Sequence, residues 1–225
     1  MKYAEKFERE SNRDYALRVI RENIINLELH PGCMISEQDL ADELEISRTP
    51  VHEALQEISK TKIIEIYPQK GSLVSLIDMK LVSEARFVRA TLESAIAEMA
   101  AEMATPEDIQ LLEENVNLQE FYDKKQVNDK IMELDNEFHK MLYKITDKMQ
   151  TYYMVKTMNI HYDRFRELRL KTSPSKPIIE EHKQILDAII AKNGTKAKEL
   201  LMTHLSRLNA DEKEIREKFD RYFIY

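Results

Sequence analysis

Glycine scarcity is the feature that most constrains this chain, because only three of its 225 residues are glycine. Proteins contain about 7% glycine on average. Loops that cradle phosphates need several glycines close together, so glycine-rich nucleotide-binding motifs are excluded. Tight turns between strands also depend on glycine, which argues against an all-β fold. The abundance of Glu, Lys, Leu and Met predicts long helices instead.

Composition narrows the class of protein further. Charged residues make up 33% and hydrophobic residues 43% of the chain, as in a globular protein. No run of about 18 apolar residues occurs, and the first ten residues are too charged for a secretory signal. The single cysteine, Cys33, excludes an internal disulfide framework and a multi-cysteine zinc site. We therefore expect a cytoplasmic protein with no membrane partner.

The N-terminal part of the chain predicts three helices. Apolar residues recur at helical spacing between residues 11 and 29. Ser36 begins a short second helix, because a serine followed three residues later by an acid is typical of a helix N-terminus. After a tight connection, Ser47 or Thr49 caps a third helix that runs to about residue 60.

A β-hairpin follows these helices. Residues 63–66 and 73–77 are rich in β-branched side chains and surround a six-residue loop with one proline and one glycine. Two tightly joined helices followed by a hairpin are typical of a winged helix-turn-helix domain. We therefore predict a winged helix-turn-helix DNA-binding domain over residues 1–77.

Residues 78–225 predict a second domain, an all-helical bundle of about six helices. No strand pattern returns after residue 78, and amphipathic segments follow one another. After one long helix, further helices are expected near 106–123, 128–146, 149–171, 178–193 and 195–218. Asn193-Gly194 is expected to end a helix with a left-handed residue. The predicted fold class is therefore mostly α.

The third helix and the hairpin tip carry the residues that a winged helix presents to DNA. The N-terminal residues of the recognition helix reach bases and phosphates. In this chain they are Ser47, Arg48, Thr49 and His52. Lys70 at the hairpin tip is placed to reach a phosphate, with Gly71 permitting close approach. The alternative is a small helical domain used for protein contacts.

The charge of this segment argues against strong DNA binding. Residues 1–78 contain 10 Lys or Arg and 15 Asp or Glu, a net charge of −5 in a chain whose total is −7. DNA affinity rests largely on neutralised phosphates. We therefore expect weak, dimer-dependent binding with a modest dependence on salt concentration.

Several stretches within about residues 10–77 resemble the winged helix of GntR-type bacterial transcriptional regulators. They are His30-Pro31-Gly32, Ile35 to Ala41, Ile46 to Val51, Glu53-Ala54-Leu55 and Pro68 to Gly71. The resemblance implies operator binding as a homodimer and adds Ser36 and Gln38 to the DNA-binding residues. The family usually has arginine at the position of His52 and often at that of Gln38.

Four residues of the helical part could hold a metal. Asp135 and His139 are four residues apart and therefore share one helix face. His182 lies 12 residues before Gly194 and His204 lies 10 after it, so an antiparallel helix pair brings them to similar heights. Three imidazoles and one carboxylate suit a divalent transition metal. Unrelated surface or capping histidines are the simpler interpretation on spacing alone.

Residues 80–210, approximately, resemble the FCD effector domain. The matching stretches are Arg89 to Glu93, Asp135 to His139, Glu181 to Ile189 and Met202 to Leu205. The resemblance implies a divalent metal such as zinc, nickel or manganese, with open positions for a small carboxylate effector. The implied metal ligands are Asp135, His139, His182 and His204.

A third group of residues could bind the effector directly. His161, Arg164, Arg166 and Arg169 lie close together in sequence, and arginines that face a bundle interior can bind an organic acid bidentately. Such a run is also typical of a solvated helix face. With Arg89 from the resembling motif, His161 and Arg164 are the predicted effector-binding residues.

These features together predict a ligand-responsive transcriptional regulator rather than an enzyme. A small acid bound by metal and arginines would change the relative poses of two winged helices. The alternatives are a metal-dependent hydrolase, because three histidines and an open site can activate water, and a non-catalytic helical interaction protein. The absence of an H-E-x-x-H motif argues against the hydrolase.

Overall fold

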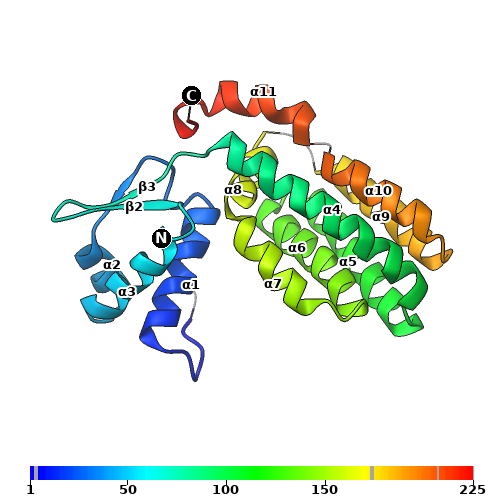
Figure 1. Cartoon of the computed structure of the whole chain (residues 1–225), viewed down its shortest axis with the longest axis horizontal. Coiled ribbons are helices and arrows are strands. Elements are labelled where there is room, and N and C mark those ends of the chain that lie inside the picture. The colour runs from blue at the N-terminus through cyan, green and yellow to red at the C-terminus, as the bar shows by residue number, and fades with distance from the viewer. Residues whose placement is uncertain (3–4, 173–174, 207, 225) are drawn as a thin grey trace. The chain divides into compact units, whose positions relative to one another are not determined.

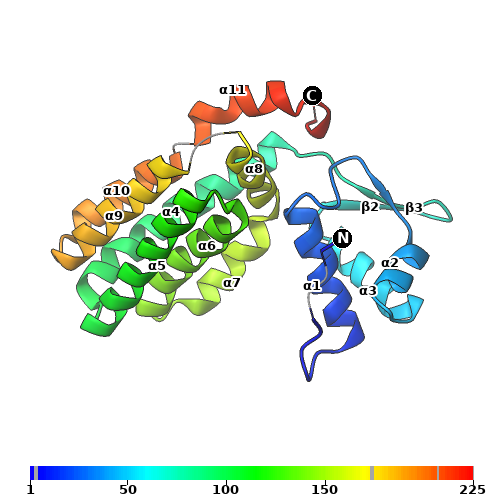
Figure 2. The ribbon, with the colours of Figure 1, turned by 180° about the vertical axis from the view of Figure 1, so that it is seen from behind.

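The computed structural model describes residues 1–2, 5–172, 175–206 and 208–224. For residues 208–211 this description covers the backbone alone. The chain divides into two compact units, each described here by itself. The first comprises Met1–Val82, Ile160–Glu167 and Arg216–Tyr225, and the second comprises Ser83–Asn159 and Leu168–Ile215. The predicted fold class is confirmed, since helices and a small sheet are followed by a helical part (Figures 1 and 2). The predicted domain boundary after residue 77 stays a prediction.

Serine residues mark the helix starts of the first unit. Its N-terminal helices are α1 (Asn12–Ile25), α2 (Glu37–Glu43) and α3 (Arg48–Ser59). The hydroxyl of Ser36 accepts backbone N–H groups of α2, which confirms it as the N-cap. Ser47 is the N-cap residue of α3, although its side chain makes no capping hydrogen bond.

The wing contains three strands rather than the two that were predicted. Strands β2 (Ile64–Tyr67) and β3 (Gly71–Val74) form the expected hairpin, and β1 (Met34–Ile35) pairs antiparallel with β3. Gly71 has a φ of 102°, and a Cβ atom there would lie 2.7 Å from the carbonyl oxygen of Ile35. The close approach of β1 therefore requires glycine at this position.

The core of the first unit lies between its helices and the sheet. Val19, Ile20, Val51 and Leu55 are fully buried there. Ile160, the first residue of α8 (Ile160–Leu170), packs against the same core. The first half of α8 thus belongs to the winged-helix unit, although the sequence places it deep in the helical part.

The second unit is helical throughout its described residues. Its helices are α4 (Met79–Met103, which begins in the first unit), α5 (Pro106–Lys125), α6 (Asn128–Ile145), α7 (Met149–Met158), α9 (Lys176–Ile190) and α10 (Gly194–Ser206). The expected helix 149–171 is divided at Asn159 into α7 and α8. The expected helix 195–218 corresponds to α10 and α11 (Leu208–Lys218), with residue 207 outside the description.

The connection between α9 and α10 corrects one detail of the prediction. Lys192, not Gly194, is the left-handed residue, with a φ of 54°. Gly194 is the first residue of α10, and a Cβ atom there would lie 2.9 Å from the carbonyl oxygen of Glu98. Glycine is therefore needed at this position for close packing against α4 rather than for a turn.

Candidate metal centre and DNA-binding surface

Four side chains from three helices meet in a buried cluster within the second unit. Asp135 and His139 come from α6, His182 from α9 and His204 from α10. One potential ligand atom of each residue lies within 4.8 Å of the corresponding atoms of the others. All four side chains are buried. The structure thus brings together the whole set of proposed metal ligands.

The Nε2 atoms of the histidines converge on one point. Nε2 of His139 lies 3.3 Å from Nε2 of His204 and 3.9 Å from Oδ2 of Asp135. Nε2 of His182 lies 3.8 Å from Oδ1 of Asp135. A transition metal bonds to such atoms at about 2.0–2.2 Å. These separations therefore fit four donors placed around one cation.

The Nδ1 atoms of the same histidines face oxygen atoms outside the cluster. Glu93 Oε2 lies 2.6 Å from Nδ1 of His139. Gln119 Oε1 lies 2.8 Å from Nδ1 of His182. Glu181 Oε2 lies 2.9 Å from Nδ1 of His204. An acceptor at Nδ1 selects the tautomer whose Nε2 lone pair is available to a metal.

These three oxygen acceptors were not predicted from the sequence. Glu93 could have been noticed as the last residue of the Arg89 motif, and Glu181 as the neighbour of His182. Gln119 carried no signal, because it comes from α5, which contributes no metal ligand. Outer partners from separate helices become visible only in the folded chain.

Buried charged groups flank the cluster. Arg89 Nε donates a hydrogen bond to Oε1 of the buried Glu93 at 2.7 Å. Burial opposes ionisation of Glu93, but Arg89 and His139 outweigh it and lower its pKa to about 2. Burial lowers the pKa of His139 to about 4, which keeps the imidazole neutral near pH 7.

Acidic oxygens lie close to the histidines. The carboxylates of Glu93, Asp135 and Glu181 each lie within 3.9 Å of an imidazole nitrogen. The nitrogen and oxygen donors of the cluster suit a transition metal.

The predicted effector-binding residues are divided between the two compact units. Arg89 lies beside the cluster in the second unit, whereas His161 and Arg164 belong to the first unit. His161 and Arg164 are buried, so they do not form a solvated helix face. Their role in binding an effector stays a prediction.

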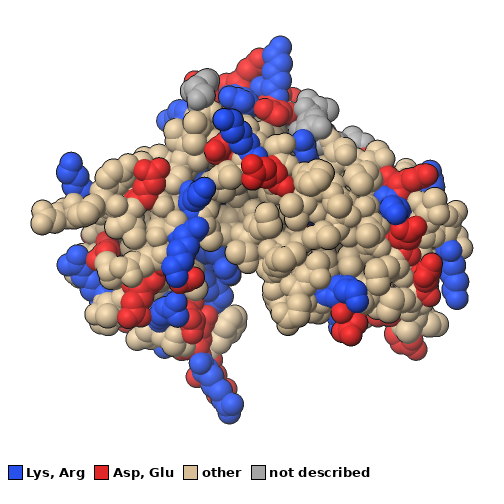
Figure 3. All heavy atoms as spheres, in the orientation of Figure 1, with Lys and Arg blue, Asp and Glu red and all other residues tan. Residues whose placement is uncertain are grey.

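In the first unit, α3 and the wing line a shared groove. Its lining includes six predicted DNA-binding residues, namely Ser36, Gln38, Arg48, His52, Lys70 and Gly71. Ser47 and Thr49 lie at the N-terminus of α3. On the face that Figure 3 shows, Lys and Arg side chains are interspersed with Asp and Glu rather than gathered in one basic patch. This mixture agrees with the negative charge of the segment.

One acidic residue in the groove, Glu37, contacts two of the predicted DNA-binding side chains. It was not predicted from the sequence. Glu37 Oε2 accepts a hydrogen bond from Nε of Arg48 at 2.9 Å, and its Oε1 lies 2.7 Å from Nδ1 of His52. The hydrogen bonds from His52 and Arg48 lower the pKa of Glu37 and outweigh burial, which raises it. Glu37 therefore holds both basic side chains of α3 in defined positions.

Comparisons with known proteins define the class. Residues 15–74 match the model of bacterial regulatory proteins of the gntR family, and residues 84–207 match the FCD domain. The chain therefore belongs to the GntR-family transcriptional regulators with an FCD domain, which are DNA-binding proteins rather than enzymes. No helix in the described residues has the length and apolar character needed to cross a membrane.

Particular relatives cover nearly the whole chain. The HTH-type transcriptional repressor RspR of Escherichia coli is 28% identical over 207 residues, which span 92% of this chain and 91% of RspR. The Nta operon transcriptional regulator of Aminobacter aminovorans is 23% identical and spans 81% of this chain and 86% of its own. The solved structure of E. coli McbR/YncC matches with a TM-score of 0.81 at 18% identity, over 93% of this chain and 99% of that one. This likeness shows the fold.

Proposed function

We propose that this transcriptional regulator binds a divalent metal and a small carboxylate effector in its FCD domain, and that the effector alters operator binding. The observation that carries the proposal is the buried cluster of Asp135, His139, His182 and His204. One potential ligand atom of each residue lies within 4.8 Å of the others, and the Nε2 atoms of His139 and His204 lie 3.3 Å apart. A cluster of this kind is costly to bury without a cation.

A bound divalent metal would supply positive charge and open coordination positions for a carboxylate oxygen. The chain's own residues support an anionic ligand near this point. Arg89 presents a buried guanidinium, and the hydroxyl of the buried Tyr143 has no hydrogen-bond partner among the described residues. Burial and the nearby Glu93 raise the pKa of Tyr143, which keeps its hydroxyl protonated as a donor. We include Arg89 and Tyr143 among the effector contacts.

Elemental analysis of protein purified without added metal or chelator tests the metal site. The wild type is expected to contain about one equivalent of a divalent transition metal. Asp135→Ala is expected to contain little, while Asp187→Ala, which changes an exposed aspartate of α9, retains the metal. An absence of metal in the wild type, even after addition of zinc, nickel or manganese, would contradict the proposal.

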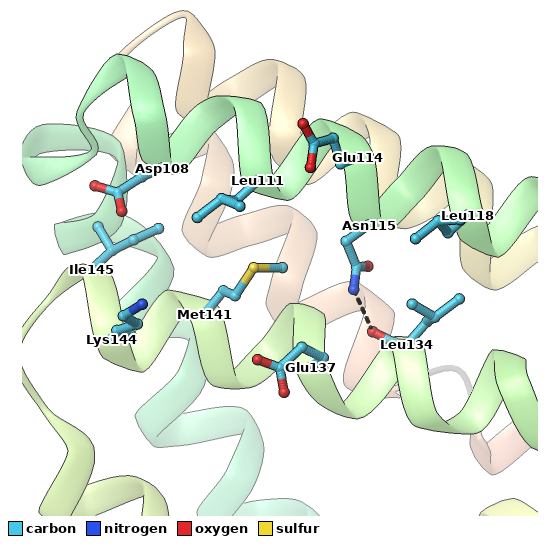
Figure 4. Close-up of a pocket in the computed structure, with 10 residues that line it drawn as sticks. All are labelled: Asp108, Leu111, Glu114, Asn115, Leu118, Leu134, Glu137, Met141, Lys144 and Ile145. Atoms are coloured by element: carbon cyan, nitrogen blue, oxygen red, sulfur yellow. Dashed lines mark hydrogen bonds between the residues drawn. The ribbon is translucent and has the colours of Figure 1, made fainter.

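We also propose that the operator-binding form is a homodimer, because two-fold operators match two-fold proteins. Figure 4 shows a surface pocket between α5 and α6. Leu111 and Leu118 of α5 line it and are 47% and 45% exposed, and Met141 of α6 lies in the same pocket. An apolar groove of this kind is typical of a protein contact surface.

Two charged residues that line this groove have opposite signs and lie on the same helix, while Asp108 and Glu114 make the lining acidic on balance. Glu137 and Lys144 are exposed on α6 and stand seven residues apart, with Met141 between them. If α6 packs antiparallel on α6 of a second copy, Glu137 of each copy faces Lys144 of the other. The groove therefore suits a second copy of this chain as its occupant.

A further inference from the structure

Arg164 is a buried cation that makes no ion pair with any residue that the structure describes. Its side chain is fully buried, and Nη2 donates a hydrogen bond to the backbone carbonyl of Ser75. Nε and Nη1 have no hydrogen-bond acceptor within the part of the chain that the structure describes. Burial lowers the pKa of Arg164 to about 10, so the guanidinium remains charged at neutral pH.

The same compact unit contains other buried polar atoms that lack a hydrogen-bond partner among the described residues. His161, one helical turn earlier, is 5% exposed, and neither ring nitrogen makes a hydrogen bond of good geometry to another described residue, although the backbone of Thr61 lies near enough to act on its pKa. The hydroxyl of Ser75 is buried without a partner as well. Burial and the charge of Arg164 lower the pKa of His161 to about 4, so the imidazole is a neutral donor and acceptor.

Two other buried arginines have a carboxylate partner within the chain. Arg89 is paired with Glu93 at 2.7 Å, and Arg166 is paired with Asp163 at 3.1 Å. An unpaired buried charge destabilises a fold, and buried polar groups are otherwise almost always hydrogen-bonded. Arg164 departs from this pattern on the same helix as Arg166, which points to a partner from outside the chain.

We propose that Arg164, His161 and Ser75 form a second anion-binding site, located in the first unit, that takes a small monocarboxylate without the metal. Lys62 and Asp78, which also act on His161, have opposite charges, so the net local charge is that of the Arg164 guanidinium, and a monocarboxylate balances it. A phosphate dianion would leave one negative charge buried in its place. Carboxylate oxygens can accept from Nε and Nη1 of Arg164, and the imidazole and hydroxyl can fill the remaining hydrogen bonds.

The location gives the site a connection to the DNA-binding wing. Ser75 directly follows β3, and Arg164 holds its carbonyl oxygen. A ligand on Arg164 therefore contacts the segment by which the wing continues into α4. The site lies in a different compact unit from the metal cluster, so the two can be tested separately.

Thermal melting and calorimetric titration of the full-length protein test this site. The probes are acetate, lactate and benzoate, with chloride and inorganic phosphate as comparisons, at constant ionic strength and with a chelator present. Wild type and Asp135→Ala are expected to show the same saturable rise in melting temperature with a monocarboxylate. Arg164→Met is expected to lose the response, and His161→Gln to bind about tenfold more weakly. Arg166→Met, the matched control on α8, is expected to retain it.

The melting temperature without any anion distinguishes ligand binding from a purely structural role of Arg164. Without any anion, Arg164→Met is expected to melt no lower than the wild type, because it removes an uncompensated charge. A structural arginine would instead give a less stable variant with no anion response to lose. The proposal is overturned if no monocarboxylate shifts the wild type, if phosphate alone does, or if Arg164→Met responds like the wild type. A response that disappears with the metal would assign the ligand to the metal centre.

Discussion

The Nε2 atoms of His139 and His204 lie 3.3 Å apart, although 65 residues separate them in the chain. Each ring has its Nδ1 atom against a carboxylate, an arrangement that favours a proton on Nδ1 and leaves Nε2 for a metal. A cation between the two Nε2 atoms would accept a lone pair from each ring. Under the proposed function, the metal therefore has a direct role in stability.

Removal of the metal is expected to lower the melting temperature of the wild type. A ligand that binds only the folded state stabilises it by about 2.7 kcal/mol at a free concentration of 100 times its Kd. His204→Ala should lose most of this stabilisation, so a chelator should hardly change its melting curve. His30→Ala, in the first unit, serves as the control and should respond as the wild type does. Equal melting of metal-free and metal-bound wild type would show that the ion contributes nothing to stability.

The oxygen atoms behind the histidines are expected to set metal affinity. Gln119→Leu removes the acceptor at Nδ1 of His182, so the ring is no longer held in the metal-binding tautomer. Chelator competition should show affinity weakened by about 10- to 100-fold. Glu181→Gln keeps an acceptor for His204 and should weaken binding less than Glu181→Leu. If both leucine variants bind as tightly as the wild type, these contacts do not orient the ligands.

Operator binding is expected to depend on Arg48. Its side chain is 65% exposed and is positioned by Glu37, so Arg48→Ala should abolish binding while leaving the melting curve unchanged. Fluorescence anisotropy with the DNA upstream of the gene measures this. Lys70→Ala should weaken binding to all sequences and reduce the salt dependence by about one unit of slope. Lys124→Ala, on an exposed position of α5, is the control. Unchanged binding by Arg48→Ala would contradict the role given to α3.

A charge exchange tests the proposed dimer surface. Glu137→Lys would place a lysine opposite Lys144 of the second copy, so the variant should dissociate to monomer in light-scattering measurements. The double variant Glu137→Lys with Lys144→Glu restores opposite charges and should recover the dimer. The exchange changes exposed residues, so folding should be unaffected. A dimer that persists in the single variant would place the interface elsewhere.

The fold was largely predictable because its signals are local. Helical spacing, serine caps and a β-branched hairpin are each contained within a few turns of chain, and Ser36 confirms such a signal. Strand β1 was missed because two residues are too few to show alternation. The prediction for Gly194 was wrong because the atom that leaves no room for a Cβ there is the carbonyl oxygen of Glu98, which lies on another helix. Errors therefore occur where one element meets another.

The candidate metal site was also predictable only where its signals are local. The shared face of Asp135 and His139 follows from their spacing on α6, but spacing alone did not favour their meeting with His182 and His204. The resemblance to the FCD domain supplied that step, and the structure brings all four together. The unpaired charge of Arg164 could not be predicted, because its sequence neighbours include both acids and bases. Only the fold shows which of them reach it.

His161 is expected to make the free energy of unfolding depend on pH in the acid range. Burial and Arg164 lower the pKa of His161 to about 4, with Lys62 acting in the same direction and Asp78 opposing it. The unfolded chain has an imidazole pKa of about 6.5, so between these values it binds more protons than the folded chain. The contribution of His161 to the free energy of unfolding is therefore fully present above pH 6.5. It is lost as the pH falls towards 4, by up to about 3 kcal/mol.

His161→Gln cannot titrate in this range, so its free energy of unfolding should fall less steeply with acid than that of the wild type. Denaturant unfolding from pH 7 to pH 4 measures the difference between the two proteins. A chelator is present throughout, so that loss of metal at low pH contributes to neither curve, and carboxylate buffers are avoided. His30→Gln provides the matched control and should keep the wild-type slope. Parallel curves for wild type and His161→Gln would show that the imidazole of His161 is not held neutral by the fold.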